Sequence, residues 1–89
     1  MDQIIIKKLT EEEIEKMGIR EWPIWEKEIS NFDWHYDQDE QCLLLEGKVA
    51  VETKSGTVEF QAGDFVHFKA GLSCSWDVQV PVRKHYRFL

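Results

Sequence analysis

The sequence predicts an all-β domain with one short helix near its N-terminus. From Trp22 onward, short stretches rich in Val, Ile, Phe, Trp and Thr are separated by Gly, Asp, Asn and Ser at intervals of about ten residues, which is typical of antiparallel strands. Residues that typically begin and end a helix occur before Trp22, and no comparable helix signals occur after it. Consecutive strands without intervening helices predict a sandwich or a barrel, because an open meander would leave its edges exposed.

The helix is predicted over residues Thr10 to Met17. Thr10 and Glu13 have the spacing of a capping box, in which the Thr hydroxyl and the Glu carboxylate each accept one unpaired amide at the start of a helix. Gly18 is expected to end the helix. Only Ile14 and Met17 form an apolar stripe, so the helix is expected to serve packing.

Nine strands are predicted from short apolar and alternating segments bounded by turn residues. They are Ile4–Lys8, Trp25–Ser30, Phe32–Tyr36, Gln41–Glu46, Lys48–Lys54, Thr57–Gln61, Phe65–Lys69, Ser73–Val80 and Arg83–Phe88. A hairpin turn is expected at Lys54-Ser55-Gly56. Gly47, Gly63 and Gly71 are interpreted as turn glycines rather than as phosphate-binding glycines, because no helix follows them.

The length of 89 residues predicts a single domain, 1–89, in which 1–21 hold an N-terminal strand and the helix and 22–88 hold the barrel. The formal net charge is −6, which argues against nucleic-acid binding through phosphate attraction. Two cysteines, Cys42 and Cys74, are too few for the disulfide framework of a small secreted scaffold, so free thiols are expected. Without a targeting segment or a long apolar run, we expect a cytoplasmic protein with no membrane association.

Strand alternation indicates which polar side chains share a face. Asp33 and His35 lie on one face of the predicted strand Phe32–Tyr36, and its three aromatic side chains lie on the other. On a later strand, Cys74 and Trp76 share a face. The residues expected to meet inside the barrel as metal ligands or proton-handling groups are Asp33, His35, Glu40 and Cys74.

Two motifs carry a resemblance to a known fold family. His35 is separated by four residues from Glu40, and six more precede Gly47, a spacing that resembles the second half of the first cupin motif. The stretch 63–71 resembles the second cupin motif, with Lys69 where Pro usually stands. The chain therefore resembles a single-domain cupin, and more narrowly the small stand-alone proteins of the ureidoglycine aminohydrolase cupin domain family. This resemblance implies a small jelly-roll-like β-barrel that pairs as a homodimer.

The chain departs from the cupin pattern at two ligand positions. Asp33 stands at the position of the first motif's first His, and Cys74 stands at that of the second motif's His. A set of carboxylates, imidazole and thiolate can still bind a divalent metal, with Zn, Ni, Fe and Mn as the candidates. Ureidoglycine aminohydrolases are two-cupin proteins that use manganese, so the resemblance does not assign their substrate to this chain.

Two hypotheses for function follow. In the first, the chain is an enzyme or enzyme-like protein for a small polar metabolite, in which Asp33, His35, Glu40 and Cys74 hold a metal. Glu40 and Asp33 would then act as acid–base groups, and Trp76, Trp25 and Lys84 would bind the substrate. In the alternative, the barrel is a metal-free module that binds a small ligand or a protein partner. In that case His35 and Glu40 are a polar pair at the barrel mouth, and Cys74 is a buried thiol.

Overall fold

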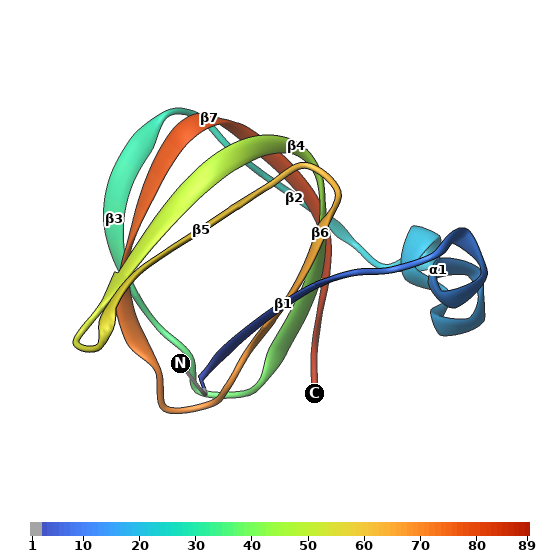
Figure 1. Ribbon diagram of the computed structural model, residues 1–89, viewed down its shortest axis with the longest axis horizontal. Coiled ribbons are helices and arrows are strands. Elements are labelled where there is room, and N and C mark those ends of the chain that lie inside the picture. The colour runs from blue at the N-terminus through green and yellow to red at the C-terminus, as the bar shows by residue number, and fades with distance from the viewer. Residues whose placement is uncertain (1–2) are drawn as a thin grey trace.

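The computed structural model describes residues 3–89 and has seven strands and one α-helix, followed by a short 3₁₀ helix, η1 (Figure 1). The elements are β1 (Ile4–Lys8), α1 (Glu11–Met17), η1 (Ile19–Glu21), β2 (Ile24–Lys27), β3 (Ser30–His35), β4 (Glu40–Thr53), β5 (Gly56–Gln61), β6 (Asp64–Phe68) and β7 (Ser73–Phe88). The predicted all-β class with one short N-terminal helix is confirmed. No helix among the described residues is long and apolar enough to cross a membrane.

All seven strands belong to one antiparallel sheet whose central path runs β1-β6-β4-β7-β2. Strand β3 pairs with β7, and β5 pairs with β4. The sheet curls around its core like a jelly roll, as Figure 1 shows. Among residues 3–89, the path of paired strands begins at β1 and ends at β2, so the curled sheet is not closed into a full barrel.

The structure has fewer strands than predicted because two pairs of predicted strands are continuous. Segments 41–46 and 48–54 form the single strand β4, and segments 73–80 and 83–88 form β7. Gly47 therefore lies at a bend within β4 rather than in a turn between strands, and the register with β7 shifts on both sides of it. The bend lets one strand contribute to both halves of the sheet.

The N-terminal helix is built as the sequence predicts. Thr10 Oγ1 accepts a hydrogen bond from the Glu13 amide at 3.1 Å, and the Glu13 carboxylate accepts one from the Thr10 amide at 2.9 Å. Gly18 ends the helix with φ of 67°, in the left-handed region that glycine adopts at low cost. Ile14 packs with residues of η1, β4 and β6 in a small apolar cluster that is separate from the main core.

The main core occupies the inner side of the curled sheet. It is lined by aliphatic and aromatic side chains from β4, β5, β6 and β7 together with Tyr36, which follows β3. Cys42 is fully buried within it, which agrees with its interpretation as a core residue. Between β2, β3, β4 and β7 the packing leaves a pocket, and this pocket is the first candidate for a binding site.

Candidate functional site

An interior pocket of about 220 Å³ opens between β2, β3, β4 and β7. It is lined by Trp25, Phe32, Trp34, Tyr36, Glu40, Trp76, Lys84, Tyr86 and Phe88. Its wall is thus mainly aromatic and contains one acid and one base. Trp34 and Phe88 are about half exposed, so they form the part of the lining that meets solvent. The volume is below the roughly 300–1,000 Å³ of pockets for drug-sized ligands, which points to a small molecule.

The acid and the base of this pocket form a buried ion pair. Lys84 Nζ lies 2.7 Å from Glu40 Oε2, and the two side chains are only 5% and 6% exposed. Strand alternation places Glu40 on the same inner face as Cys42, and Lys84 on the same inner face as Tyr86. Because a buried charge is tolerated when it is paired, each of these two side chains depends on the other.

Two tryptophans enclose the ammonium of Lys84. Its Nζ lies 4.9 Å from the ring centroids of both Trp25 and Trp76, within the range of cation–π attraction. Trp25 is placed opposite Lys84 by the pairing of β2 with β7. The predicted substrate-binding residues Lys84, Trp25 and Trp76 therefore lie together in one pocket.

Trp76 also has a buried hydrogen-bond donor, which lies near Tyr36 and the Cys74 sulfur but makes no hydrogen bond of normal geometry. Among the buried side-chain nitrogen and oxygen atoms of residues 3–89, its Nε1 is the one without a hydrogen bond. Tyr36 is nearby, and burial together with the Glu40 carboxylate raises the pKa of its hydroxyl far above the usual range, so the phenol keeps its proton. The pocket wall thus includes the Trp76 indole and a phenol that keeps its proton.

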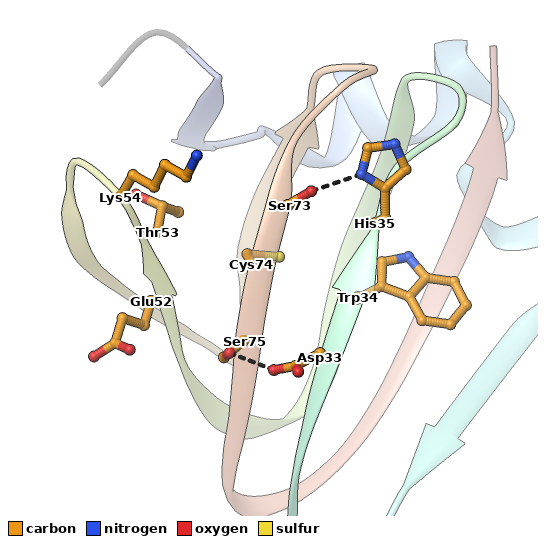
Figure 2. A pocket seen from close by; sticks show the side chains of 9 residues that line it. All are labelled: Asp33, Trp34, His35, Glu52, Thr53, Lys54, Ser73, Cys74 and Ser75. Atoms are coloured by element: carbon orange, nitrogen blue, oxygen red, sulfur yellow. Dashed lines mark hydrogen bonds between the residues drawn. The ribbon is translucent and has the colours of Figure 1, made fainter.

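The other two predicted site residues, Asp33 and His35, lie on the opposite side of β3. His35 Nδ1 is hydrogen-bonded to Ser73 Oγ at 2.7 Å, and the Ser75 hydroxyl donates to Asp33 Oδ1 at 2.6 Å (Figure 2). In Figure 2, the ring of Trp34 extends away from both of these pairs. The outer face of β3 therefore carries the polar residues.

Asp33, His35, Glu40 and Cys74 do not all converge around one cavity as predicted, because Asp33, His35 and Cys74 line an outer groove and Glu40 lines the interior pocket. In the antiparallel pairing of β3 with β7, Cys74 lies opposite Trp34, so it faces the opposite side of the sheet from Asp33 and His35. Glu40 is inside and already bonded to Lys84. Within residues 3–89, no group of three or more His, Cys, Asp or Glu side chains is placed to hold a metal ion.

An open groove of about 660 Å³ lies beside these outer residues, between β3 and the β4–β5 hairpin (Figure 2). Ser73, His35 and Asp37 are the residue types of a nucleophilic triad, but His35 Nε2 is 3.7 Å from Asp37 Oδ1, too far for a hydrogen bond that orients the ring. The side chains of His35 and Asp37 are 54% and 91% exposed, so water screens the pair. The interior pocket is therefore the stronger candidate site.

Sequence reasoning did not predict that Glu40 and Lys84 pair, or that Phe32 and Tyr36 line the site. A signal for Lys84 was present, because it stands two residues from both Val82 and Tyr86 on a strand. A lysine in phase with apolar residues faces the interior, and an interior lysine requires a carboxylate nearby. The separation of 44 residues between Glu40 and Lys84 hides the partner from any local pattern.

Both cysteines are free and buried, as predicted. Burial raises the pKa of Cys42 to about 11 and that of Cys74 to about 11. For Cys74, the nearby Trp76 indole offsets this increase only in part. At neutral pH both sulfurs are therefore thiols, and neither has the thiolate that a nucleophile needs.

We expect the native protein to react slowly with a thiol reagent such as dithionitrobenzoate at pH 8. The unfolded protein should react at once through two thiols. Because the pKa of each thiol is higher in the folded state, burial of the protonated thiols stabilises the fold. This stabilisation is complete below about pH 9 and is lost as the pH rises toward 11. The measurement is reagent absorbance with time, with and without denaturant. Fast native labelling of either cysteine would contradict it.

This chain matches known proteins in both sequence and fold. A family model described as the EutQ-like cupin domain matches residues 14–86. A DUF861 family protein from Thermotoga maritima has a crystal structure with 48% sequence identity and a TM-score of 0.94, covering 97% of this chain and 99% of that one. No curated protein gave a match.

More distant structures share the fold. A putative ethanolamine utilization protein Q (EutQ) from Salmonella typhimurium has 21% identity and a TM-score of 0.67, covering 96% of this chain and 68% of that chain. A DUF861 protein of unknown function from Pseudomonas syringae pv. tomato has 25% identity and a TM-score of 0.67, covering 74% of this chain and 29% of that one. The predicted cupin-type fold is confirmed by these matches.

Proposed function

Since the chain belongs to the EutQ-like cupin domain family, whose DUF861 member from Thermotoga maritima matches nearly all of it, we propose that it binds a small uncharged molecule in its interior pocket without a metal ion. The observation that carries this proposal is the buried Lys84–Glu40 pair set in an aromatic wall. The narrower resemblance to ureidoglycine aminohydrolase cupin domains stays a prediction, and the proposal does not depend on it.

The donor set of the interior does not fit a divalent metal. Glu40 offers a carboxylate, but the ammonium of Lys84 lies 2.7 Å from it and would repel a cation at the same oxygen. Cys74 does not join Glu40 in any group of three or more possible ligands within residues 3–89. The imidazole that the cupin pattern would add, His35, lies on the other face of β3.

The charge and the lining of the pocket indicate the ligand. Lys84 and Glu40 neutralise each other, so a charged ligand would enter an apolar cavity without a counterion, which is costly. The rings of Trp25, Phe32 and Trp76 favour an apolar or aromatic body. The unpaired Trp76 Nε1 favours a ligand with a hydrogen-bond acceptor.

Titration of the protein with benzamide, followed by ligand-observed NMR, tests the proposal. Benzamide is expected to bind, and the cation benzylamine is expected to bind more weakly because its ammonium would face Lys84. Trp76→Phe keeps a ring but removes the N–H, and should weaken benzamide binding roughly 2–10-fold, as expected for one hydrogen bond. His35→Ala, on the outer face, is the matched control and should leave binding unchanged.

Two results would count against this function. Benzamide binding that responds to His35→Ala but not to Trp76→Phe would place the ligand in the outer groove. Zinc, nickel, iron or manganese that raises the melting temperature of the wild type, but not that of Glu40→Gln, would favour the metal-centred enzyme instead.

A further inference from the structure

Lys84 has the surroundings of a reactive amine. Among the described lysines it is the buried one, at 4% exposure, whereas Lys27 is half-buried and the remainder are exposed. Its Nζ lies between two indole rings and lines the same pocket as the proposed ligand site. A lysine held in an apolar pocket is the type of amine that enzymes use to form Schiff bases with carbonyl compounds.

Glu40 is placed to move the protons that such a reaction requires. Its Oε2 accepts a hydrogen bond from Lys84 Nζ at 2.7 Å, so a proton can pass between them without an intervening water. Passing one proton to Glu40 leaves a neutral amine beside a neutral carboxylic acid, and neither is penalised by the apolar wall as a separated charge would be. Lys84 can therefore become nucleophilic without leaving its place.

The pocket also has donors for the oxygen of a carbonyl group. Trp76 Nε1 is buried and has no hydrogen-bond partner, and Tyr36 lines the same pocket and keeps its phenolic proton. Donors aimed at a carbonyl oxygen stabilise the negative charge that grows on it when an amine attacks the carbon.

We propose that the interior pocket captures a small uncharged aldehyde or ketone as a Schiff base on Lys84. This proposal rests on the proposed function, because it names the ligand class of the same pocket. The ammonium gives one proton to Glu40, and the neutral Nζ attacks the carbonyl carbon. The new C–N bond forms as the C=O π bond breaks, and the attacking nitrogen passes one of its protons to the carbonyl oxygen, which gives a neutral carbinolamine while Glu40 keeps its proton. Glu40 returns its proton to the hydroxyl, water leaves, and a protonated imine remains, so protons and charge balance without an oxidant or a reductant.

Reductive trapping tests this step. Wild-type protein is incubated with benzaldehyde and sodium cyanoborohydride near pH 7, and the benzylated lysines are located and timed by peptide mass spectrometry. Lys84 is expected to be labelled at least ~10-fold faster than Lys54, which lies exposed on the β4–β5 hairpin and serves as an internal control. Competing benzamide should slow labelling at Lys84 and leave Lys54 unchanged.

Two variants distinguish proton transfer by Glu40 from mere access of the aldehyde to Lys84. Glu40→Gln should slow labelling at Lys84 by at least ~10-fold, a modest share of the 10²–10⁴ typical of general acid–base catalysis, and should leave Lys54 unchanged. Lys84→Arg keeps a cation for Glu40 but cannot form an imine, so labelling at position 84 should disappear. If either variant unfolds, the ratio of Lys84 to Lys54 labelling in the wild type decides alone.

The outcomes distinguish this proposal from the one on which it rests. Labelling of Lys54 as fast as that of Lys84, with benzamide still bound, would overturn the Schiff base and leave the binding function standing. Failure of both labelling at Lys84 and benzamide binding would overturn both. Fast labelling at Lys84 that Glu40→Gln leaves unchanged would overturn the role of Glu40 as the proton carrier.

Discussion

Gly47→Ala is expected to lower the free energy of unfolding by about 3 kcal/mol or more, because a methyl group at this bend overlaps backbone that cannot move aside. A Cβ at position 47 would lie 2.6 Å from the Pro81 carbonyl oxygen and 2.8 Å from Val82 Cα, both on β7. The φ of Gly47 is 109°, which adds strain for any residue with a Cβ. Urea denaturation followed by tryptophan fluorescence measures the change.

Gly71→Ala is the matched control for the space around Gly47. Gly71 also has a positive φ, 93°, but a Cβ there would meet nothing within 4 Å. Its substitution should therefore cost only the backbone strain, about 1–2 kcal/mol. Equal losses for the two variants would mean that the close approach of β4 and β7 at Gly47 contributes nothing.

Lys84→Met is expected to cost about 3–5 kcal/mol, because it leaves the carboxylate of Glu40 buried without a partner. The double variant Lys84→Met/Glu40→Leu removes both charges and should recover most of this loss, since apolar side chains of similar volume can replace a buried pair at little cost. Denaturation of the two single variants and the double variant gives the coupling energy.

Lys7→Met provides the comparison for this pair, because Lys7 is an exposed lysine on β1. Its substitution should change the unfolding free energy by less than about 0.5 kcal/mol. Losses that simply add in the Lys84 and Glu40 double variant would contradict the mutual dependence of the two side chains.

The sequence predicted the local features well because they depend on neighbouring residues. The capping box of Thr10 and Glu13 formed as expected, since both partners lie within one helical turn. One of the two extra predicted strands arose because a glycine at a bend and a glycine in a turn look the same in sequence. What distinguishes Gly47 is β7 passing against it, a contact between segments more than thirty residues apart.

Strand alternation correctly separated the residues of the two faces of β3, but it did not show which of the two faces is buried. The spacing of His35 and Glu40 suggested that the polar face was inner. The structure buries the face of Phe32 and Tyr36 instead, and leaves Asp33 and His35 exposed. Burying large aromatic surfaces contributes more free energy than burying polar groups, which must first be desolvated. A motif spacing therefore needs to be weighed against the aromatic content of the opposite face.

The two long strands, β4 and β7, couple the folding and unfolding of the two halves of the sheet. Strand β7 pairs with β2, β3 and β4, and β4 pairs with β5, β6 and β7, so both run through the two halves of the curled sheet. Neither half can open without breaking the pairing of a strand that the other half uses, which favours one cooperative transition. A molecule held in the interior pocket therefore stabilises residues far from it, including the β4–β5 hairpin that it does not touch.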